Sequence, residues 1–426
     1  MTENNKDNNK NIFVQFLEWC KRNLFTPYML LLFMFCIAFS QFIYYQKHKT
    51  DSAFLEIINN IKNEIDIKKK SNFANMIYPR YYHTATKLND GNIIFIGGGS
   101  KFSEIYDTKN NQFIKGAECK YDRYMHNVVK LSNGNLLIIG GHDEKNPSQE
   151  IYDVEIYDWK KQKFSVFTKL NKSLFCPQSV IFNQNYIVVF SSKISHNNQY
   201  SGLPEIINLK TQTAKIIKDF PIDYITYFNL PIFLINADNN ILFFKLDKEL
   251  KNSKNLLWNG KIFIETNTYE FFTKGWSMIC PMDNNIIFYT KSVYENSKNF
   301  YKIGKFNIKT GENKELINHQ QNKKYDSFTP SVIMPIGYNK IVIAGGKTHI
   351  PKVKTQYSKD VFLYEKDKIK KIGLLYNKSL INFTISDVKN NEILICGGRF
   401  LNTNDKSSNN KYEQTNKCQF INYKKE

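Results

Sequence analysis

Two segments in the first third of the chain repeat one another, and this repetition limits the possible folds more than any other feature. Residues 80–98 (RYYHTATKLNDGNIIFIGG) align with residues 123–141 (RYMHNVVKLSNGNLLIIGG) at a constant offset of 43. Each copy contains an apolar strand, an Asx-Gly turn, a second apolar strand and a double glycine, which is the pattern of a β-hairpin. A chain with such an internal period folds as stacked units that bury their apolar faces against one another.

Weaker copies of the repeat continue to the end of the chain. Residues 104–107 and 155–158 are both Glu-Ile-Tyr-Asp, and Phe113 and Phe164 follow them at the same offset of 51. Later copies of the second strand end near residues 192, 244, 289, 346 and 398. These positions predict about seven units of four short strands each. Six is the alternative count, because the third, fourth and fifth units lack the double glycine.

This pattern resembles the kelch repeat, in which an Arg-x-x-His segment precedes an apolar strand, a double glycine and a Tyr-Asp pair. The resemblance covers residues 76–426 and implies an all-β propeller of four-stranded blades. Phe113 and Phe164 stand in the region where kelch repeats usually carry a tryptophan. The last unit stops after its third strand, so we predict that residues 72–78 complete it by pairing with residues 419–423, because a closed ring leaves no strand edge exposed.

The chain before the repeats predicts membrane attachment. Residues 1–26 combine a polar tail with an apolar helical face suited to a membrane interface. Residues 27–46 predict a single transmembrane helix, because the eighteen positions from Tyr28 to Tyr45 carry no charge and have tyrosines at both ends. The lysines and arginine that flank this span slightly favour a cytoplasmic N-terminus, which would place the propeller on the extracytoplasmic side.

Residues 47–71 predict a helical stalk between the span and the propeller, which we assign to residues 72–426. Phe54, Ile58, Ile61 and Ile65 are spaced by four, three and four residues, as in a coiled-coil seam. The seam fits a homo-oligomer formed through the stalk and fits equally well a helix packed on the adjoining domain.

The formal net charge of +20 raises the question of a nucleic-acid partner. Only four of the 59 basic residues are arginines, and no helix or aromatic stripe concentrates the charge. We therefore interpret the charge as a dispersed basic surface and predict no specific nucleic-acid partner.

Candidate ligand-binding residues come from one face of the predicted propeller. Loops between second and third strands, and loops between blades, emerge together there, and they include residues 142–150, 193–204, 291–299, 347–360 and 399–416. Arg80, Arg123 and Arg399 map to this face, and arginine offers a planar fork for carboxylates. We predict these three and His142 as ligand-binding residues. The alternative for Arg80 and Arg123 is a structural role in the repeat, and for His142 a solvated turn.

The seven cysteines show no CxxC pair and no regular spacing, so we predict no metal and no cofactor. Most are expected to be small core residues. Cys396 and Cys418 fall on neighbouring strands of the last repeat, which leaves a disulfide between them open.

No phosphate loop, HExxH or G-x-S-x-G motif is present. We predict a membrane-anchored binding module that recognises a protein or glycan through its loop-rich face. The alternative is a sugar-active enzyme, similar to the sialic-acid epimerases or to galactose oxidase among kelch-like proteins, although no residues match the copper and Tyr–Cys motif of the oxidase. Whether the protein is an enzyme therefore stays open.

Overall fold

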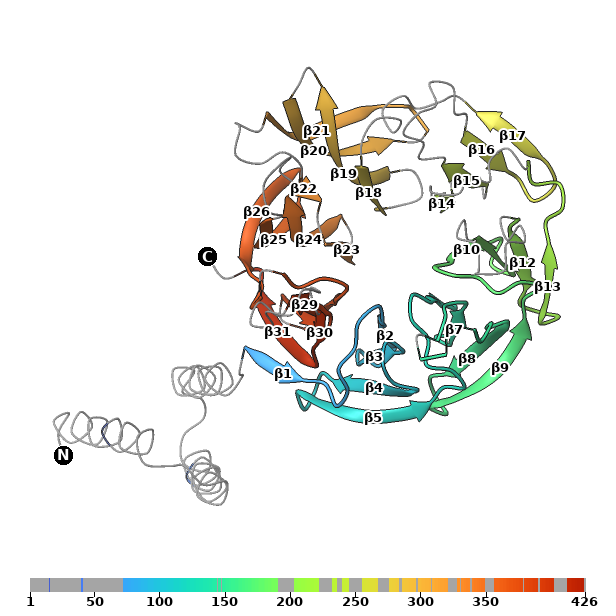
Figure 1. The fold of residues 1–426 in the computed structure, drawn as a ribbon, viewed down its shortest axis with the longest axis horizontal. Helices are drawn as coiled ribbons and strands as arrows, with labels where there is room; N and C mark the ends of the chain where they lie inside the picture. The colour runs from blue at the N-terminus through green and yellow to red at the C-terminus, as the bar shows by residue number, and fades with distance from the viewer. Residues whose placement is uncertain are drawn as a thin grey trace, which may run out of the picture. The chain divides into compact units, whose positions relative to one another are not determined.

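The first repeat folds into a four-stranded antiparallel sheet with its strands in sequence order. β2 (Thr84–Lys87) is followed by β3 (Ile93–Ile96), β4 (Phe102–Asp107) and β5 (Gln112–Glu118), which lies on the outside of the ring in Figure 1. Gly91 closes the β2–β3 turn with a φ of +88°, a left-handed conformation that glycine adopts without steric cost. The left-handed φ at this turn position therefore explains why the sequence has glycine there.

In this computed structural model, seven such sheets form a β-propeller (Figure 1). We number the blades by the chain order of their inner strands. Blade 2 contains β6 (Asn127–Lys130), β7 (Leu136–Ile139), β8 (Asp153–Asp158) and β9 (Lys163–Lys169). Blade 3 contains β10 (Gln178–Phe182), β11 (Tyr186–Phe190), β12 (Glu205–Asn208) and β13 (Thr213–Ile216). Blade 4 contains β14 (Ile232–Ile235), β15 (Ile241–Phe244), β16 (Asn255–Trp258) and β17 (Phe263–Thr266).

The remaining blades vary this plan. Blade 5 contains β18 (Trp276–Pro281), β19 (Ile286–Glu295), β20 (Lys298–Asn307) and β21 (Asn313–Gln320). Blade 6 contains β22 (Phe328–Thr329), β23 (Val332–Gly337), β24 (Lys340–Thr348), β25 (Gln356–Glu365) and β26 (Lys368–Leu374), with β22 and β23 both paired to β24. Blade 7 is the sheet β27 (Thr384–Asp387), β28 (Glu392–Cys396), β31 (Lys417–Asn422) and β1 (Phe73–Asn75), and it carries the hairpin β29 (Arg399–Leu401) and β30 (Tyr412–Gln414). The blade count of seven is thus confirmed.

The structure describes most of the propeller and little of the preceding segment. The chain divides into two units, residues 1–71 and 72–426. Of the first unit only Gln15 and Ser40 are described, and the second is described except at 144, 147, 191–202, 222–231, 236–239, 245–254, 267–275, 283–285, 296–297, 308, 321–327, 330, 338, 349–355, 378, 390, 402–411 and 425–426. The predicted interfacial helix, the transmembrane helix at 27–46 and the stalk at 47–71 lie outside the described residues. Among those that are described, no helix is long and apolar enough to cross a bilayer.

The core of the propeller lies between neighbouring blades. All four side chains of β3 are buried, because each face of the sheet packs on another blade. Ile93 and Phe95 belong to a cluster with Leu394 of blade 7, whereas Ile94 and Ile96 belong to a cluster with residues of blade 2. The two-residue side-chain period of a strand thus joins each blade to both neighbours.

Blade 7 takes its outermost strand from the beginning of the propeller. β1 pairs antiparallel with β31, with Phe73 opposite Gln419 and Asn75 opposite Lys417. The pairing continues through the backbone N–H of Met76, which donates to the carbonyl oxygen of Asn416 at 2.7 Å. The predicted closure is therefore confirmed, although the observed partners of β1 start at residue 417 instead of 419.

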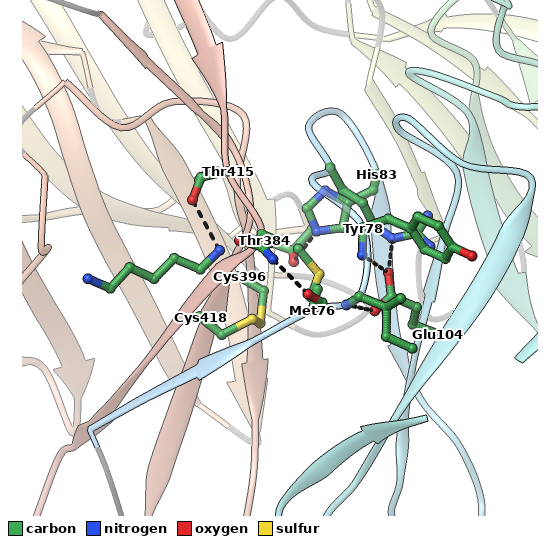
Figure 2. The surroundings of a disulfide bond; sticks show 12 residues. Met76, Tyr78, His83, Glu104, Thr384, Cys396, Thr415 and Cys418 are labelled. Carbon is green, nitrogen blue, oxygen red and sulfur yellow. Dashed lines mark hydrogen bonds and ion pairs between the residues drawn. A yellow bond between two sulfur atoms is a disulfide. The ribbon is translucent and has the colours of Figure 1, made fainter. Parts of the chain in front are cut away.

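Two further links lie in blade 7 and between blades 7 and 1 (Figure 2). Cys396 on β28 and Cys418 on β31 form a disulfide, and both side chains are fully buried. Across the gap between blades 7 and 1, the hydroxyl oxygen of Thr384 lies 2.9 Å from Nε2 of His83. The disulfide that the sequence left open is thus present, and it lies in the blade that joins the two ends of the propeller.

Two of the predicted long loops are strand extensions. Residues 291–295 and 298–299 continue β19 and β20 as one antiparallel ribbon, with Glu295 opposite Lys298. Residues 347–348 and 356–360 likewise extend β24 and β25. The prediction of loops over 291–299 and over the ends of 347–360 was wrong, because β-pairing there continues well beyond the usual length of a blade strand.

Candidate functional site

Arg123 lies inside blade 2, with its side chain buried beside Glu155. Its Nε and Nη2 donate to Oε2 of Glu155 at 3.0 and 2.9 Å. The remaining donors reach the carbonyl oxygens of Gly140 at 2.8 Å and Asp153 at 2.7 Å. The second oxygen of Glu155 accepts the backbone N–H of Lys120 at 2.7 Å. Both charges are therefore neutralised and hydrogen-bonded within the blade, as a buried ion pair requires.

Arg80 repeats this arrangement in blade 1. Its Nε donates to Glu104 at 2.8 Å and its Nη1 donates to the carbonyl oxygen of Gly97 at 2.6 Å. Arg80 and Arg123 are both 0% exposed. We therefore remove them from the predicted ligand-binding set: their guanidiniums are engaged behind the surface, in the structural role that the sequence left as the alternative.

Blades 3 and 7 have no arginine at the position equivalent to Arg123. Leu174 stands at the position of Arg123 in blade 3, where the buried Glu205 instead accepts hydrogen bonds from the backbone N–H groups of Asn171 and Lys172 at 2.8 and 3.1 Å. In blade 7 the equivalent residues are Leu380 and Gln419, and the Gln419 side chain bonds to the backbone at both of its ends. The Arg–Glu pair is thus one of several side-chain combinations that occur at these two positions of a blade.

The two repeated histidines join neighbouring blades. Nδ1 of His126 lies 3.2 Å from the carbonyl oxygen of Arg123, and Nε2 lies 2.9 Å from the hydroxyl oxygen of Thr84 in blade 1. A carbonyl only accepts, so Nδ1 carries the proton and Nε2 accepts from the threonine. Burial, with the positive charge of Arg123 beside it, lowers the pKa of His126 to about 3. This histidine is therefore a neutral structural group.

The residue after the double glycine lies at an equivalent position in blades 2 and 7. In blade 2 this is His142, whose backbone forms an isolated bridge with Tyr124, and in blade 7 it is Arg399, whose backbone forms the equivalent bridge with Ile381. Blade 1 has Gly99 here, and an added Cβ would lie 2.7 Å from the carbonyl oxygen of Pro79. The structure therefore brings the predicted residues Arg399 and His142 to equivalent positions.

Arg399 packs against three tyrosine rings. Its guanidinium carbon lies 4.9 Å from the ring centroid of Tyr81, 5.3 Å from that of Tyr82 and 5.0 Å from that of Tyr412. Tyr81 and Tyr82 belong to the segment that leads into blade 1, whereas Tyr412 belongs to the β29–β30 hairpin of blade 7. Within the described part of the chain, this guanidinium has no ion pair and no hydrogen bond, and its Nε is buried without a partner.

The aromatic contacts continue from Arg399 toward blade 3. The rings of Tyr81 and Tyr124 lie 5.0 Å apart, those of Tyr124 and His142 lie 6.0 Å apart, and those of His142 and Phe175 lie 4.4 Å apart. We call this set the aromatic rim; it comprises Tyr81, Tyr82, Tyr124, His142, Phe175, Arg399 and Tyr412. Tyr81 and Tyr124 are almost fully buried, whereas Tyr412 is 37% exposed and the other members are partly exposed.

Sequence reasoning missed the aromatic members of the rim, although a signal for three of them was present. Tyr81, Tyr124 and Phe175 stand at equivalent repeat positions, with the offsets of 43 and 51 that relate the first three units. Each of these rings lies beside the residue that follows the double glycine of the preceding blade. Tyr412 had no such signal, because its hairpin is an insertion found in blade 7. The loops of 193–204 and 399–416, which were predicted on this face, lie largely outside the described residues.

Other features of the described chain fit a scaffold. A hollow of about 340 Å³ lies between the outer strands β5 and β9, and it is lined by Glu118, Lys120, Glu155 and Ser165 among others. Two of its charged groups are already engaged, because Glu155 is bonded to Arg123 and Lys120 is paired with Asp153. No group of three or more His, Cys, Asp or Glu side chains in the described residues is arranged to hold a metal ion.

Comparison with known proteins does not identify a family for this chain. No protein-family model matches the sequence, and no curated protein matches it. A solved structure described as "Structure of YjhT" aligns with a TM-score of 0.45 at 14% identity, over 82% of this chain and 96% of that one. At this level of similarity the alignment carries no conclusion about function.

Proposed function

We propose that this protein is a kelch-type binding module, displayed from a membrane by residues 27–46, which recognises a protein or glycan through the face that bears the aromatic rim. The propeller supplies a rigid support, and binding residues are commonly presented by loops on such a support. Stalk residues 47–71 hold the module away from the bilayer and offer a seam for a homo-oligomer.

The aromatic rim is the observation that carries this proposal. It spans four blades, from Arg399 in blade 7 to Phe175 at the start of blade 3, and it combines partly exposed aromatic rings with a cation that has no acidic partner among the described residues. Tyrosine and arginine dominate the residues that contribute most to protein binding.

The disulfide supports an extracytoplasmic position for the propeller. Stable disulfides form in oxidising compartments, and thiols in the cytosol are kept reduced. Cys396 and Cys418 are bonded and fully buried, whereas Cys119 and Cys280 are buried thiols. This agrees with the orientation expected from the charges that flank residues 27–46.

A sugar-active enzyme remains the second candidate, and one observation weighs against it. Such an enzyme would combine the histidine, arginine and tyrosines of the rim with a carboxylate that is free to take part in proton transfer. Two carboxylates lie near Tyr124 of the rim. Asp122 is 3% exposed and accepts the backbone N–H of Gly99 at 3.1 Å and the ammonium of Lys145 at 3.3 Å, and Asp143 accepts the backbone N–H groups of Lys145 and Asn146 at 2.9 and 3.3 Å. This favours binding over catalysis at the described rim.

The test compares the two faces of the propeller. Full-length protein is screened against glycans and against proteins of the surrounding compartment, and each ligand found is titrated against rim and control variants. Tyr412→Ala with Phe175→Ala should weaken binding by about tenfold or more, because aromatic anchors carry most of the energy. Ile262→Ala is the control, because Ile262 is 57% exposed in the β16–β17 turn on the opposite face. Equal binding by the rim variant would contradict the proposal.

A further inference from the structure

We propose that Arg399 is the docking point for a carboxylate of an acidic protein partner, with Tyr412 as the ring that packs beside it. This inference rests on the proposed binding function and specifies the chemistry of the ligand. It starts from a contrast between arginines: Arg80 and Arg123 each have a buried glutamate partner, whereas Arg399 has none among the described residues.

The surroundings of Arg399 explain why a ligand would bind there. A guanidinium has five N–H donors, and a donor removed from water without an acceptor is unfavourable. Nε of Arg399 is buried and lacks an acceptor, while the tyrosine rings pack around the group at 4.9 to 5.3 Å. The rings cannot accept a strong in-plane hydrogen bond, so the guanidinium has hydrogen-bonding capacity that an acceptor on a ligand would satisfy.

A carboxylate fits this edge better than other anions. Its two oxygens match the planar fork of arginine in a bidentate pair. Phosphate groups are typically held by clusters of cations. Among the described residues, Arg399 is the cation that packs on the rings of Tyr81, Tyr82 and Tyr412. The surrounding rings also exclude water, which strengthens an ion pair.

The partner is inferred to be a protein because of what the rim exposes. Tyr81 is 4% exposed and Tyr124 is 2% exposed, so neither presents the open ring face on which a sugar ring would stack. Arg399, Tyr82 and Tyr412 are partly exposed beside one another, and this combination of residue types is typical of protein-binding hot spots. The net charge of +20 would attract an acidic protein over a longer range.

The experiment uses a small probe so that the net charge of the protein contributes little. Full-length protein is titrated with N-acetyl-glutamate amide, and binding is followed by saturation-transfer NMR. N-acetyl-glutamine amide serves as the uncharged isostere, and glucuronate and inorganic phosphate serve as competitors. The glutamate probe should bind and the glutamine probe should not. Glutamate should also compete at lower concentration than glucuronate or phosphate.

Variants locate the effect. Arg399→Gln should weaken binding of the glutamate probe by about tenfold or more, because a charge-assisted bidentate pair is lost. Arg399→Lys keeps the charge but loses the fork, so it should restore binding only in part. Lys161→Gln is the matched control: its side chain is 80% exposed in the β8–β9 turn on the opposite face, and the variant removes the same charge.

The outcomes separate the two proposals. Equal loss in Lys161→Gln and Arg399→Gln would show a general charge effect and overturn the carboxylate site. Preferential binding of glucuronate or phosphate would also overturn it, because the partner would not be an acidic protein. If Arg399→Gln loses no affinity while Tyr412→Ala with Phe175→Ala still loses its captured ligand, the carboxylate proposal fails and the binding face stands.

Discussion

Blades 2 and 7 share one backbone plan but stabilise the same place by different chemistry. In blade 2, Arg123 and Glu155 form a buried ion pair with four hydrogen bonds from the guanidinium. In blade 7, Leu380 and Gln419 stand at those positions, and the adjoining Cys396 and Cys418 form a disulfide. The residues that match this disulfide in blade 2 are the apolar pair Ile139 and Val154.

The difference shows what the repeat must keep and what it can exchange. Both blades keep a left-handed residue ahead of the inner strand, Met125 with φ +54° and Asn382 with φ +58°, and both keep the double glycine. The side chains around this backbone vary between a charge pair, an amide and a covalent bond. Blade 7 includes β1 from the N-terminal end of the propeller, and the disulfide joins β28 to β31, the strand with which β1 pairs.

The largest expected effect comes from removing one member of the charge pair. Arg123→Leu leaves Glu155 buried without its cation and should cost about 3–5 kcal/mol in the free energy of unfolding. Adding Glu155→Gln introduces the residues of blade 7 and should recover most of that loss. Urea denaturation of the full-length variants measures both. If the single and double variants are equally unstable, the two blades are not interchangeable at this place.

Removing the disulfide tests the other side of the comparison. Cys396→Val with Cys418→Ala should lower the free energy of unfolding by about 3 kcal/mol, because the bond constrains a loop with a sequence separation of 22 in the unfolded chain. Denaturation is measured at equilibrium with and without a reductant. The reductant should destabilise the natural protein and leave the variant unchanged. A natural protein that is insensitive to full reduction would show that β-pairing alone holds β28 and β31 together.

The pH dependence of stability separates the histidine-bearing blades from blade 7, where Phe383 stands at the position of His126. Burial lowers the pKa of His126 to about 3, whereas an unfolded histidine takes up a proton below about pH 6.5. The unfolded state therefore binds more protons, and stability falls as the pH drops from 6.5 toward 3. At pH 5 His126 should account for about 2 kcal/mol of this loss. His126→Phe should be measured at pH 7.5 and pH 5, and its stability should fall less between the two values; an unchanged slope would exclude this cause.

The sequence predicted the architecture well, because the repeated residues are those that the backbone turns and strands of each blade require. The Asx-Gly turn at Gly91, the double glycines and the missing fourth strand each follow from chain geometry, and they led to the blades and to the closure by β1. Side-chain partners were harder to predict. Arg80 and Arg123 were proposed for ligand binding because the sequence does not reveal which side of a strand end a guanidinium occupies.

The repeated glutamates favour the structural role for both arginines. Glu104 and Glu155 occur in identical Glu-Ile-Tyr-Asp segments, in the same two units that carry the arginines. Blade 3 keeps Glu205 but has Leu174 in place of the arginine, so the glutamate has its own backbone partners and the pairing was not obligatory. The position of Arg399 beside Tyr412 could not be predicted, because it depends on the pairing of β29 with β30, which the repeat pattern does not indicate.

Arg399 should show the smallest effect on stability, although it is the same residue type as Arg123. Arg399→Gln removes ring contacts but no ion pair within the described chain, so it should cost about 0.5–1 kcal/mol, the scale of an exposed cation–π interaction. Arg399→Lys should cost less, since the charge stays near the rings. Both are measured by urea denaturation beside Arg123→Leu. A loss for Arg399→Gln as large as that of Arg123→Leu would mean that Arg399 belongs to the scaffold. A small loss in stability together with lost binding of the glutamate probe would assign the rim arginine to the ligand and the interior arginine to the fold.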